Sequence, residues 1–183
     1  MVYEMEIAGL KRELPLFPVS ETTCIAAFIM FGDVEVTIAA AKKLLAKAPE
    51  FDIIFTAEAK SIPLAYEMAK QKGQNKYVIA RKTPKLYMED LITTQVDSIT
   101  TEHIQRLCIG KRESDMLKGK RVLIVDDVIS TGQSLAGMEN LVEQSEGTIV
   151  GKMAVLAEGN AMARNDIIVL EQLPLFNSDG TVK

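Results

Sequence analysis

The fold of this 183-residue chain is decided by one stretch of its sequence, Arg121-Val-Leu-Ile-Val-Asp-Asp-Val-Ile-Ser-Thr-Gly-Gln-Ser134. Its four consecutive aliphatic residues, Val122 to Val125, are typical of a strand that is buried on both faces of a sheet. Two adjacent carboxylates, Asp126 and Asp127, follow, and a short loop of small residues then leads into an amphipathic segment. This order predicts a strand, a loop and a helix, with the two acids at the rim of the sheet.

The loop after the acids contains the residue types that surround a phosphate group. Free amides at the start of a helix bind anions, and the helix dipole and nearby hydroxyls strengthen that binding. Two carboxylates beside such a loop would repel a phosphate unless they face sugar hydroxyls or a magnesium ion. A phosphorylated sugar meets both conditions, and we expect its phosphate on Ser130, Thr131, Gly132, Gln133 and Ser134.

Other interpretations of this stretch account for less of it. An acidic pair after an aliphatic strand also opens the receiver domains of signalling proteins, but there it lies near the start of the fold, whereas only 56 residues follow Asp127 here. The acids could also simply cap a helix. The sequence has no GxxxxGK[ST] or GxGxxG pattern, so nucleoside triphosphate and dinucleotide sites lack their usual loops.

The rest of the chain alternates between strand and helix patterns. Asp33 precedes a helical repeat of apolar residues, Pro63 opens a second one that Gly73 stops, and Gly147 is the expected end of a third. We expect helices near 34–47, 61–72 and 132–145 and strands near 51–55, 77–80, 122–125 and 149–156. The alternation predicts an α/β fold with a parallel sheet flanked by helices and ligands beyond the carboxyl ends of the strands.

Three segments fall outside this alternation. Residues 1–33 and 158–183 are expected to pack together as a small cap, or hood, over a core of about residues 34–157. Residues 86–110 are rich in Thr and β-branched side chains, which predicts a long hairpin or lid loop. The whole chain is therefore expected to form a single domain.

Composition limits the partners and the compartment. The net charge is −4 and no block of Lys and Arg occurs, which disfavours a nucleic-acid partner. Cys24 and Cys108 are far apart and predict neither a disulfide framework nor a zinc site. With an acidic amino terminus and apolar runs too short to cross a bilayer, the chain is expected in the cytoplasm, away from membranes.

Residues Val122 to Ser134 resemble the phosphoribosyl pyrophosphate motif of type I phosphoribosyltransferases, in which an aliphatic strand leads to two acids and a small-Thr-Gly turn. The resemblance implies that Asp126 and Asp127 bind the ribose 2- and 3-hydroxyls. It also implies that the loop from Ser130 to Ser134 binds the 5-phosphate. The fold, the activity and the magnesium ion of the family are then expected here too.

Two further matches come from the purine branch of that family. Thr56-Ala-Glu-Ala-Lys-Ser-Ile-Pro63 is similar to the pyrophosphate loop of adenine phosphoribosyltransferases, with Lys60 against the leaving group and Ser61 where the family often has Gly. Ala80-Arg-Lys-Thr-Pro-Lys85 resembles their Arg-Lys-x-x-Lys segment. Read alone, these cations could be ordinary solvated lysines and arginines. The resemblance implies pyrophosphate binding by Glu58, Ala59, Lys60, Ser61, Arg81, Lys82 and Lys85.

The resemblance implies a purine phosphoribosyltransferase that joins a base to phosphoribosyl pyrophosphate, with Asp126, Asp127 and Lys60 as catalytic residues. Magnesium would be held mainly by substrate oxygens, with Asp126 and Asp127 as the candidate protein ligands. Adenine is the expected base because Ala157-Glu158-Gly159 lacks the basic residue of the xanthine enzymes, although the lid segment favours xanthine. The alternatives are a xanthine or guanine enzyme and a non-catalytic sensor of the donor that regulates purine genes.

Two lid residues have side chains that can exchange protons near neutral pH. Glu102 is the nearest candidate for the lid glutamate of some adenine enzymes, and His103 is the chain's single histidine. A lone histidine in a polar loop is usually solvated, so His103 is not expected to be catalytic. Relatives in the family are often dimers, which implies a homodimer.

Overall fold

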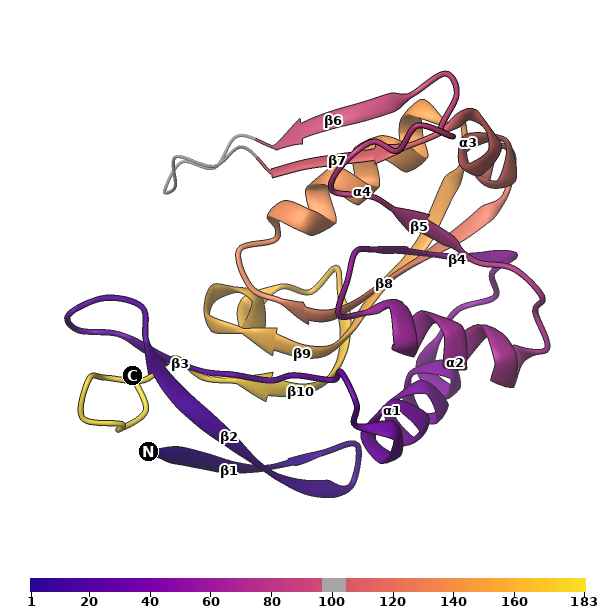
Figure 1. Ribbon diagram of the computed structural model, residues 1–183. Coiled ribbons are helices and arrows are strands. Elements are labelled where there is room, and N and C mark those ends of the chain that lie inside the picture. The colour runs from indigo at the N-terminus through magenta and orange to yellow at the C-terminus, as the bar shows by residue number, and fades with distance from the viewer. Residues whose placement is uncertain (97–104) are drawn as a thin grey trace.

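A five-stranded parallel sheet with the strand order β10-β9-β8-β4-β5 forms the centre of the computed structural model, which describes residues 1–96 and 105–183 (Figure 1). Strand β8 is the middle strand, as expected from its run of aliphatic side chains, all of them buried. The strands are β4 (Ile53–Ala57), β5 (Val78–Ala80), β8 (Arg121–Ile129), β9 (Thr148–Glu158) and β10 (Ile168–Leu173). The predicted parallel α/β sheet is confirmed.

Helices cover both faces of this sheet. Helices α1 (Val34–Lys47) and α2 (Ile62–Lys72) bury their apolar sides in one hydrophobic cluster. Helices α3 (Lys111–Leu117) and α4 (Gln133–Gln144) contribute to a second cluster on the opposite face. Each face of the sheet therefore has its own apolar core, which explains why central strands such as β8 are apolar on both sides.

The ends of the helices follow local sequence signals in two of three cases. The Asp33 side chain accepts a hydrogen bond of 3.0 Å from the Val36 amide and caps α1, and Gly73 ends α2 in the left-handed conformation with φ 75°. Helix α4 ends at Gln144, one residue before the expected bound at 145, but the left-handed residue after it is Glu146, with φ 57°, and not the expected terminator Gly147. A Cβ on Gly147 would lie 2.9 Å from Val142, so this glycine serves close packing.

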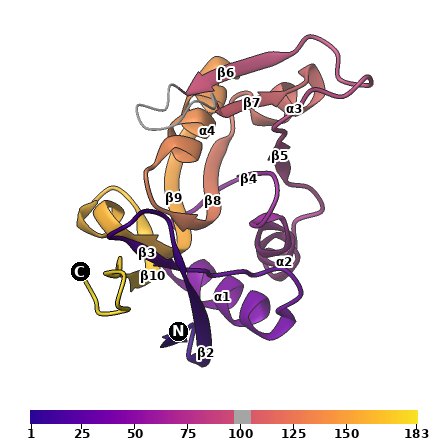
Figure 2. The same cartoon turned by 60° about the vertical axis from the view of Figure 1, so that its left-hand side comes forward.

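The two ends of the chain pack together, as Figures 1 and 2 show. Strands β1 (Val2–Ile7), β2 (Leu10–Pro18) and β3 (Cys24–Ala26) form an antiparallel sheet. The Cys24 amide donates to the Phe176 carbonyl at 2.8 Å, and the Phe176 amide donates back to Cys24 at 3.0 Å. The rings of Tyr3 and Phe176 lie 4.8 Å apart. The amino- and carboxyl-terminal segments therefore form one cap.

The carboxyl-terminal boundary of the core lies further along the chain than expected. Residues 158–183 are expected in the cap, whereas β10 is hydrogen-bonded to β9 as the edge strand of the central sheet, with Ile168 opposite Met153. A short 3-10 helix, Gly159–Ala163, connects these two strands. The central sheet thus extends to Leu173. The ten residues after it contact the amino-terminal strands through Phe176.

Strands β6 (Ile92–Val96) and β7 (Gln105–Ile109) form the expected antiparallel hairpin. The hairpin is joined to the central sheet because Arg81, after β5, exchanges two backbone hydrogen bonds of 2.8 Å with Cys108. Glu102 and His103 lie outside the described residues. Helix α3, which follows the hairpin, was not expected. No helix in the described parts of the chain is long and apolar enough to cross a bilayer.

Candidate functional site

The acid pair lies where two neighbouring strands of the sheet separate. Strand β8 is longer than expected and continues to Ile129 beside β9, with Asp126 opposite Ala154. On its other side the ladder with β4 ends earlier, at Phe55 opposite Ile124. Both acids therefore follow the last β4–β8 pair. Asp127 is 5% exposed, and Asp126 is partly buried.

The expected phosphate loop encloses a small recess next to this pair. The recess has a volume of about 100 Å³ and is lined by Asp126 and by loop and helix residues from Val128 to Leu135, including Ser130, Thr131, Gly132, Gln133 and Ser134. Gly132 precedes α4 with φ 79°, a left-handed conformation that glycine adopts without strain. The first turn of α4 directs amides with no intrahelical partner toward its amino end. The recess can therefore accept a small anion.

The segment between β4 and α2 brings a cation to the acid pair. Lys60 Nζ lies 3.1 Å from Asp127 Oδ2, and the lysine side chain is half exposed whereas the aspartate is buried. Ser61 has φ −83° and ψ −5°, a right-handed conformation that any residue adopts, so its place in a position where glycine is frequent causes no strain. The peptide bond between Glu58 and Ala59 is cis.

Glu58 connects this segment to the loop after β5. Its carboxylate lies 2.7 Å from Arg81 Nε and accepts a hydrogen bond of 2.9 Å from the Lys82 amide. Glu58 thus holds Arg81 and the loop after β5 next to the segment that carries Lys60. The side chains of Lys82 and Lys85 are exposed on the loop after β5.

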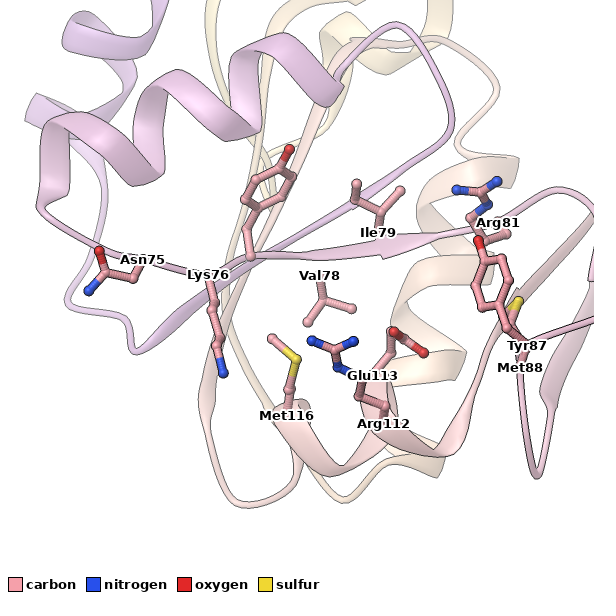
Figure 3. A pocket seen from close by; sticks show the side chains of 11 residues that line it. Asn75, Lys76, Val78, Ile79, Arg81, Tyr87, Met88, Arg112, Glu113 and Met116 are labelled. Carbon is pink, nitrogen blue, oxygen red and sulfur yellow. The ribbon is translucent and has the colours of Figure 1, made fainter. Parts of the chain in front are cut away.

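A cavity of about 410 Å³ lies along the outer side of β5, away from the acid pair (Figure 3). Figure 3 shows Arg81 beside Tyr87 at one end and Asn75 and Lys76 at the other. The lining residues come from β5, the loops on either side of it and α3, and they include neither acid nor any residue of the phosphate loop. Of the residues predicted to form the site, Arg81 alone lines this cavity. The cavity is therefore distinct from the recess beside the acid pair.

The electrostatics of the two acids differ. Burial, and next the charge of the neighbouring Asp127, raise the pKa of Asp126 to about 7. The Asp127 amide donates a hydrogen bond of 2.9 Å to Asp126 Oδ1, and Lys60 compensates Asp127. The pair therefore carries less than two full negative charges near neutral pH.

The residues of the site fit a magnesium ion that is bound mainly by oxygen atoms of the substrate. Within residues 1–96 and 105–183, no group of three His, Cys, Asp or Glu side chains could enclose a metal. Two adjacent carboxylates are nevertheless the usual protein contribution to a magnesium ion that keeps water and phosphate oxygens as its other ligands.

The structure adds contacts that the sequence did not indicate. Thr56 and the Ser61 hydroxyl are buried between β4 and β8. Arg164 approaches the phosphate loop, because a Cβ on Gly132 would lie 2.9 Å from Arg164 Nη1. Asp166 orients this arginine through hydrogen bonds of 2.9 and 2.7 Å. No spacing signal connects Arg164 to a loop 30 residues earlier, so it could not be found from the sequence.

Comparison with known proteins agrees with this geometry. Residues 34–173 match the family model of the phosphoribosyl transferase domain. The chain belongs to the phosphoribosyltransferase family. Among its relatives, the xanthine phosphoribosyltransferase of Clostridioides difficile is 31% identical over 144 residues, which are 75% of each chain. The adenine phosphoribosyltransferase of Acetivibrio thermocellus is 30% identical over 161 residues, 80% of this chain and 84% of the relative.

Other relatives are longer than the matched region. The purine biosynthesis transcriptional repressor PurR of Bacillus subtilis is 32% identical over 113 residues, which are 62% of this chain but 38% of the repressor. The chain likewise spans 62% of a xanthine phosphoribosyltransferase of Clostridium perfringens. Among solved structures, adenine phosphoribosyltransferase from Saccharomyces cerevisiae has a TM-score of 0.68 at 24% identity and covers 86% of this chain and 92% of its own, which shows the shared phosphoribosyltransferase fold. The relatives place the chain among the purine phosphoribosyltransferases without distinguishing the base.

Proposed function

We propose that this phosphoribosyltransferase transfers ribose 5-phosphate from phosphoribosyl pyrophosphate to adenine, with release of pyrophosphate, in purine salvage. The observation that carries the proposal is the contact of 3.1 Å between Lys60 and Asp127. It brings a cation of one strand-end loop to the acid pair of the next strand, directly beside a recess of phosphate size. A donor with a phosphate at one end and a pyrophosphate at the other matches this sequence of groups.

The roles of the residues follow from their charges. Asp126 and Asp127 would accept hydrogen bonds from the ribose hydroxyls and lie beside the positive charge that develops on the sugar. The loop from Ser130 to Ser134 would hold the 5-phosphate. The leaving pyrophosphate would lie against Lys60, with Glu58, Ala59, Ser61, Arg81, Lys82 and Lys85 as the remaining members of its site. A magnesium ion bound with the donor would neutralise part of the pyrophosphate charge, with Asp126 and Asp127 as its protein contacts.

A pair of substitutions tests the site. Asp127→Asn and Lys60→Ala should each reduce the rate of pyrophosphate release while the protein remains folded, as judged by circular dichroism. Lys70→Ala is the matched control, because Lys70 is an exposed lysine of α2 that pairs with Glu67 of the same helix. Rates equal to wild type in both site variants would overturn the assignment.

The choice of adenine is tested by a panel of bases. Its support is the sequence Ala157-Glu158-Gly159, which lacks the basic residue that the xanthine enzymes have near this position. We expect turnover of adenine with the donor and magnesium. Pyrophosphate release with xanthine or guanine alone would replace adenine by the alternative substrate.

A sensor without catalysis is the second candidate, because the chain is similar to the repressor PurR over 113 residues. A sensor would bind phosphoribosyl pyrophosphate in calorimetry and turn over none of the bases. Turnover of any base would exclude this function as the main one.

We also propose that the chain forms a single domain and acts as a cytoplasmic homodimer. Cys24 and Cys108 are both free and buried, which suits a reducing compartment. An apolar groove of about 510 Å³ lies between α1 and α2, and exposed Val34, Ile38 and Tyr66 contribute to it. Such a surface suits a second copy of the chain. Sedimentation equilibrium should give twice the monomer mass, and a monomer at micromolar concentration would contradict it.

A further inference from the structure

A side-chain hydrogen bond continues the contact between β4 and β8 where their backbone ladder ends. The last paired residues are Phe55 and Ile124. The next residue of β4, Thr56, places its Oγ1 2.8 Å from the carbonyl oxygen of Val125, the residue that precedes Asp126. Thr56 is fully buried. Its hydroxyl therefore bridges the two strands at the point where they diverge toward the site.

A second buried hydroxyl extends this bridge to the loop that carries Lys60. Ser61 Oγ lies 2.8 Å from Thr56 Oγ1 and 3.1 Å from the carbonyl oxygen of Ala57. Ser61 is 1% exposed although it lies at the start of α2, in a loop whose neighbour Lys60 is half exposed. Its side chain thus points into the protein, toward the acid pair.

The bridge reaches β8 at Val125, the residue directly before the acid pair. The Ser61 hydroxyl also lowers the pKa of the Asp126 carboxyl group, although burial raises that pKa more. Each hydroxyl has one proton and can accept from a second donor. Because the Val125 carbonyl can only accept, Thr56 donates its proton to Val125, and Ser61 donates to Thr56 Oγ1. Ser61 stands where the related pyrophosphate loop often has glycine. Glycine has no hydroxyl group, so the hydrogen bond between Ser61 and Thr56 depends on the serine of the present chain.

We propose that Ser61 and Thr56 are positioning residues for the transfer reaction, in which their linked hydroxyls fix Asp126 relative to the loop that carries Lys60. The inference rests on the proposed function. The two halves of the site lie on different strands that are no longer paired at this point, so their spacing depends on side-chain contacts. A small error in that spacing lowers the rate strongly, because a displacement of about 1 Å can cost on the order of 100-fold in rate.

Four variants of the bridge test this role by steady-state kinetics. Thr56→Val keeps the shape and removes the hydroxyl, whereas Thr56→Ser keeps the hydroxyl and removes a methyl group. We expect Thr56→Val and Ser61→Ala to lower kcat by at least ~10-fold, with an unchanged KM for the base, and Thr56→Ser to stay near the wild-type rate. The double variant Ser61→Ala/Thr56→Val should lose no more than the worse single variant, because both changes interrupt one chain of hydrogen bonds.

The matched control is Thr37→Val, which removes a similarly buried hydroxyl that donates to the Asp33 carbonyl in α1, at 2.7 Å. It should change the unfolding midpoint and leave kcat intact. A wild-type kcat in Thr56→Val, or losses that multiply in the double variant, would overturn the positioning role.

The outcomes separate this inference from the proposed function. If the wild type turns over a base and the bridge variants match it, the positioning role alone fails. If the wild type binds the donor in calorimetry without turnover, the same order of variants is expected in the dissociation constant of the donor, and equal constants would overturn the inference. If the wild type binds no donor, both proposals fail.

Discussion

Asp126 and Asp127 are adjacent in sequence and yet have different surroundings. Asp127 has Lys60 3.1 Å away as its compensating charge. Asp126 has the Asp127 amide and the nearby Ser61 hydroxyl instead. In the proposed reaction, carboxylates beside the sugar would stabilise the positive charge that develops on it. Each charge that is kept out of water nevertheless destabilises the folded protein.

This cost predicts that Asp126→Asn stabilises the protein. The pKa of Asp126 is raised to about 7, so the folded state keeps a proton that the unfolded state releases above its ordinary pKa of 3.8. Wild-type stability is therefore lost as the pH rises from about 4 to about 7, and the neutral amide escapes that loss. Urea unfolding should show an advantage of the variant that grows across this range and is constant above it.

Asp52→Asn provides a control of opposite sign. Hydrogen bonds from Arg121 lower the pKa of Asp52 to about 2. The charged form is favoured in the folded state, so this variant should be less stable than wild type above pH 4, and the difference should fade as the pH falls toward 2. An advantage of Asp126→Asn that is the same at every pH would contradict the assigned pKa.

Lys60 predicts a case in which stability and activity separate. Lys60→Met leaves the buried Asp127 carboxylate without its cation, which should lower the free energy of unfolding by about 1–2 kcal/mol, a moderate value because the lysine is half exposed. The double variant Lys60→Met/Asp127→Asn removes both charges. It should regain most of the stability in urea unfolding but none of the turnover. If the double variant is as unstable as Lys60→Met, the loss of stability does not come from the uncompensated charge of Asp127.

At the scale of elements, local signals located the helices well. Asp33 and Gly73 marked helix ends because caps and left-handed stops act within a few residues. Helix α3 has seven residues and Leu117 as its buried side chain, so no apolar repeat could reveal it. The edge strand β10 was missed because its pairing with β9 is a tertiary contact that no local pattern records.

For the candidate site, as for the helices, the parts that depend on local sequence were predictable and the parts that depend on distant segments were not. The acid pair, Lys60 and the phosphate loop follow predicted strands directly, and parallel strands bring their carboxyl ends to one edge of the sheet. The roles of Thr56 and Arg164 depend on how far β4 and β8 diverge and on how the chain returns after β9. Such distances arise from packing of distant segments, and a single sequence does not contain them in any local pattern.

Gly132 yields a prediction about the start of α4. Gly132→Ala combines a left-handed φ of 79° with an approach of 2.9 Å to Arg164 Nη1. Gly73→Ala is the matched control, since Gly73 has φ 75° and nothing within 4 Å of an added Cβ. Both should lose about 1 kcal/mol of stability. Gly132→Ala alone should weaken the binding of ribose 5-phosphate in calorimetry, by roughly tenfold if the loop shifts. Equal binding in both variants would show that the loop tolerates the side chain.

At the scale of the whole molecule, the two chain ends meet in the cap, while the donor site that we propose lies on the central sheet. Phe176 joins the ends, through backbone hydrogen bonds to Cys24 and through its ring contact with Tyr3. The acids and the phosphate loop belong to β8 and α4 instead. Because the resemblance to purine phosphoribosyltransferases implies that the cap contributes to base recognition, donor binding and base binding should respond to different substitutions.

Phe176→Ala tests this division. Phe176 is 1% exposed, so its truncation should cost roughly 3 kcal/mol in urea unfolding. Leu44→Ala is the control, because Leu44 is fully buried in α1 and its loss should destabilise to a similar degree. At a temperature where both variants stay folded, Phe176→Ala should raise the KM for adenine several-fold and leave the dissociation constant of phosphoribosyl pyrophosphate unchanged, whereas Leu44→Ala should alter neither. Among the contacts of the described residues, the ring of Phe176 touches neither the acids nor the phosphate loop. A loss of donor affinity in Phe176→Ala would therefore mean that the cap and the edge of the sheet bind the donor together.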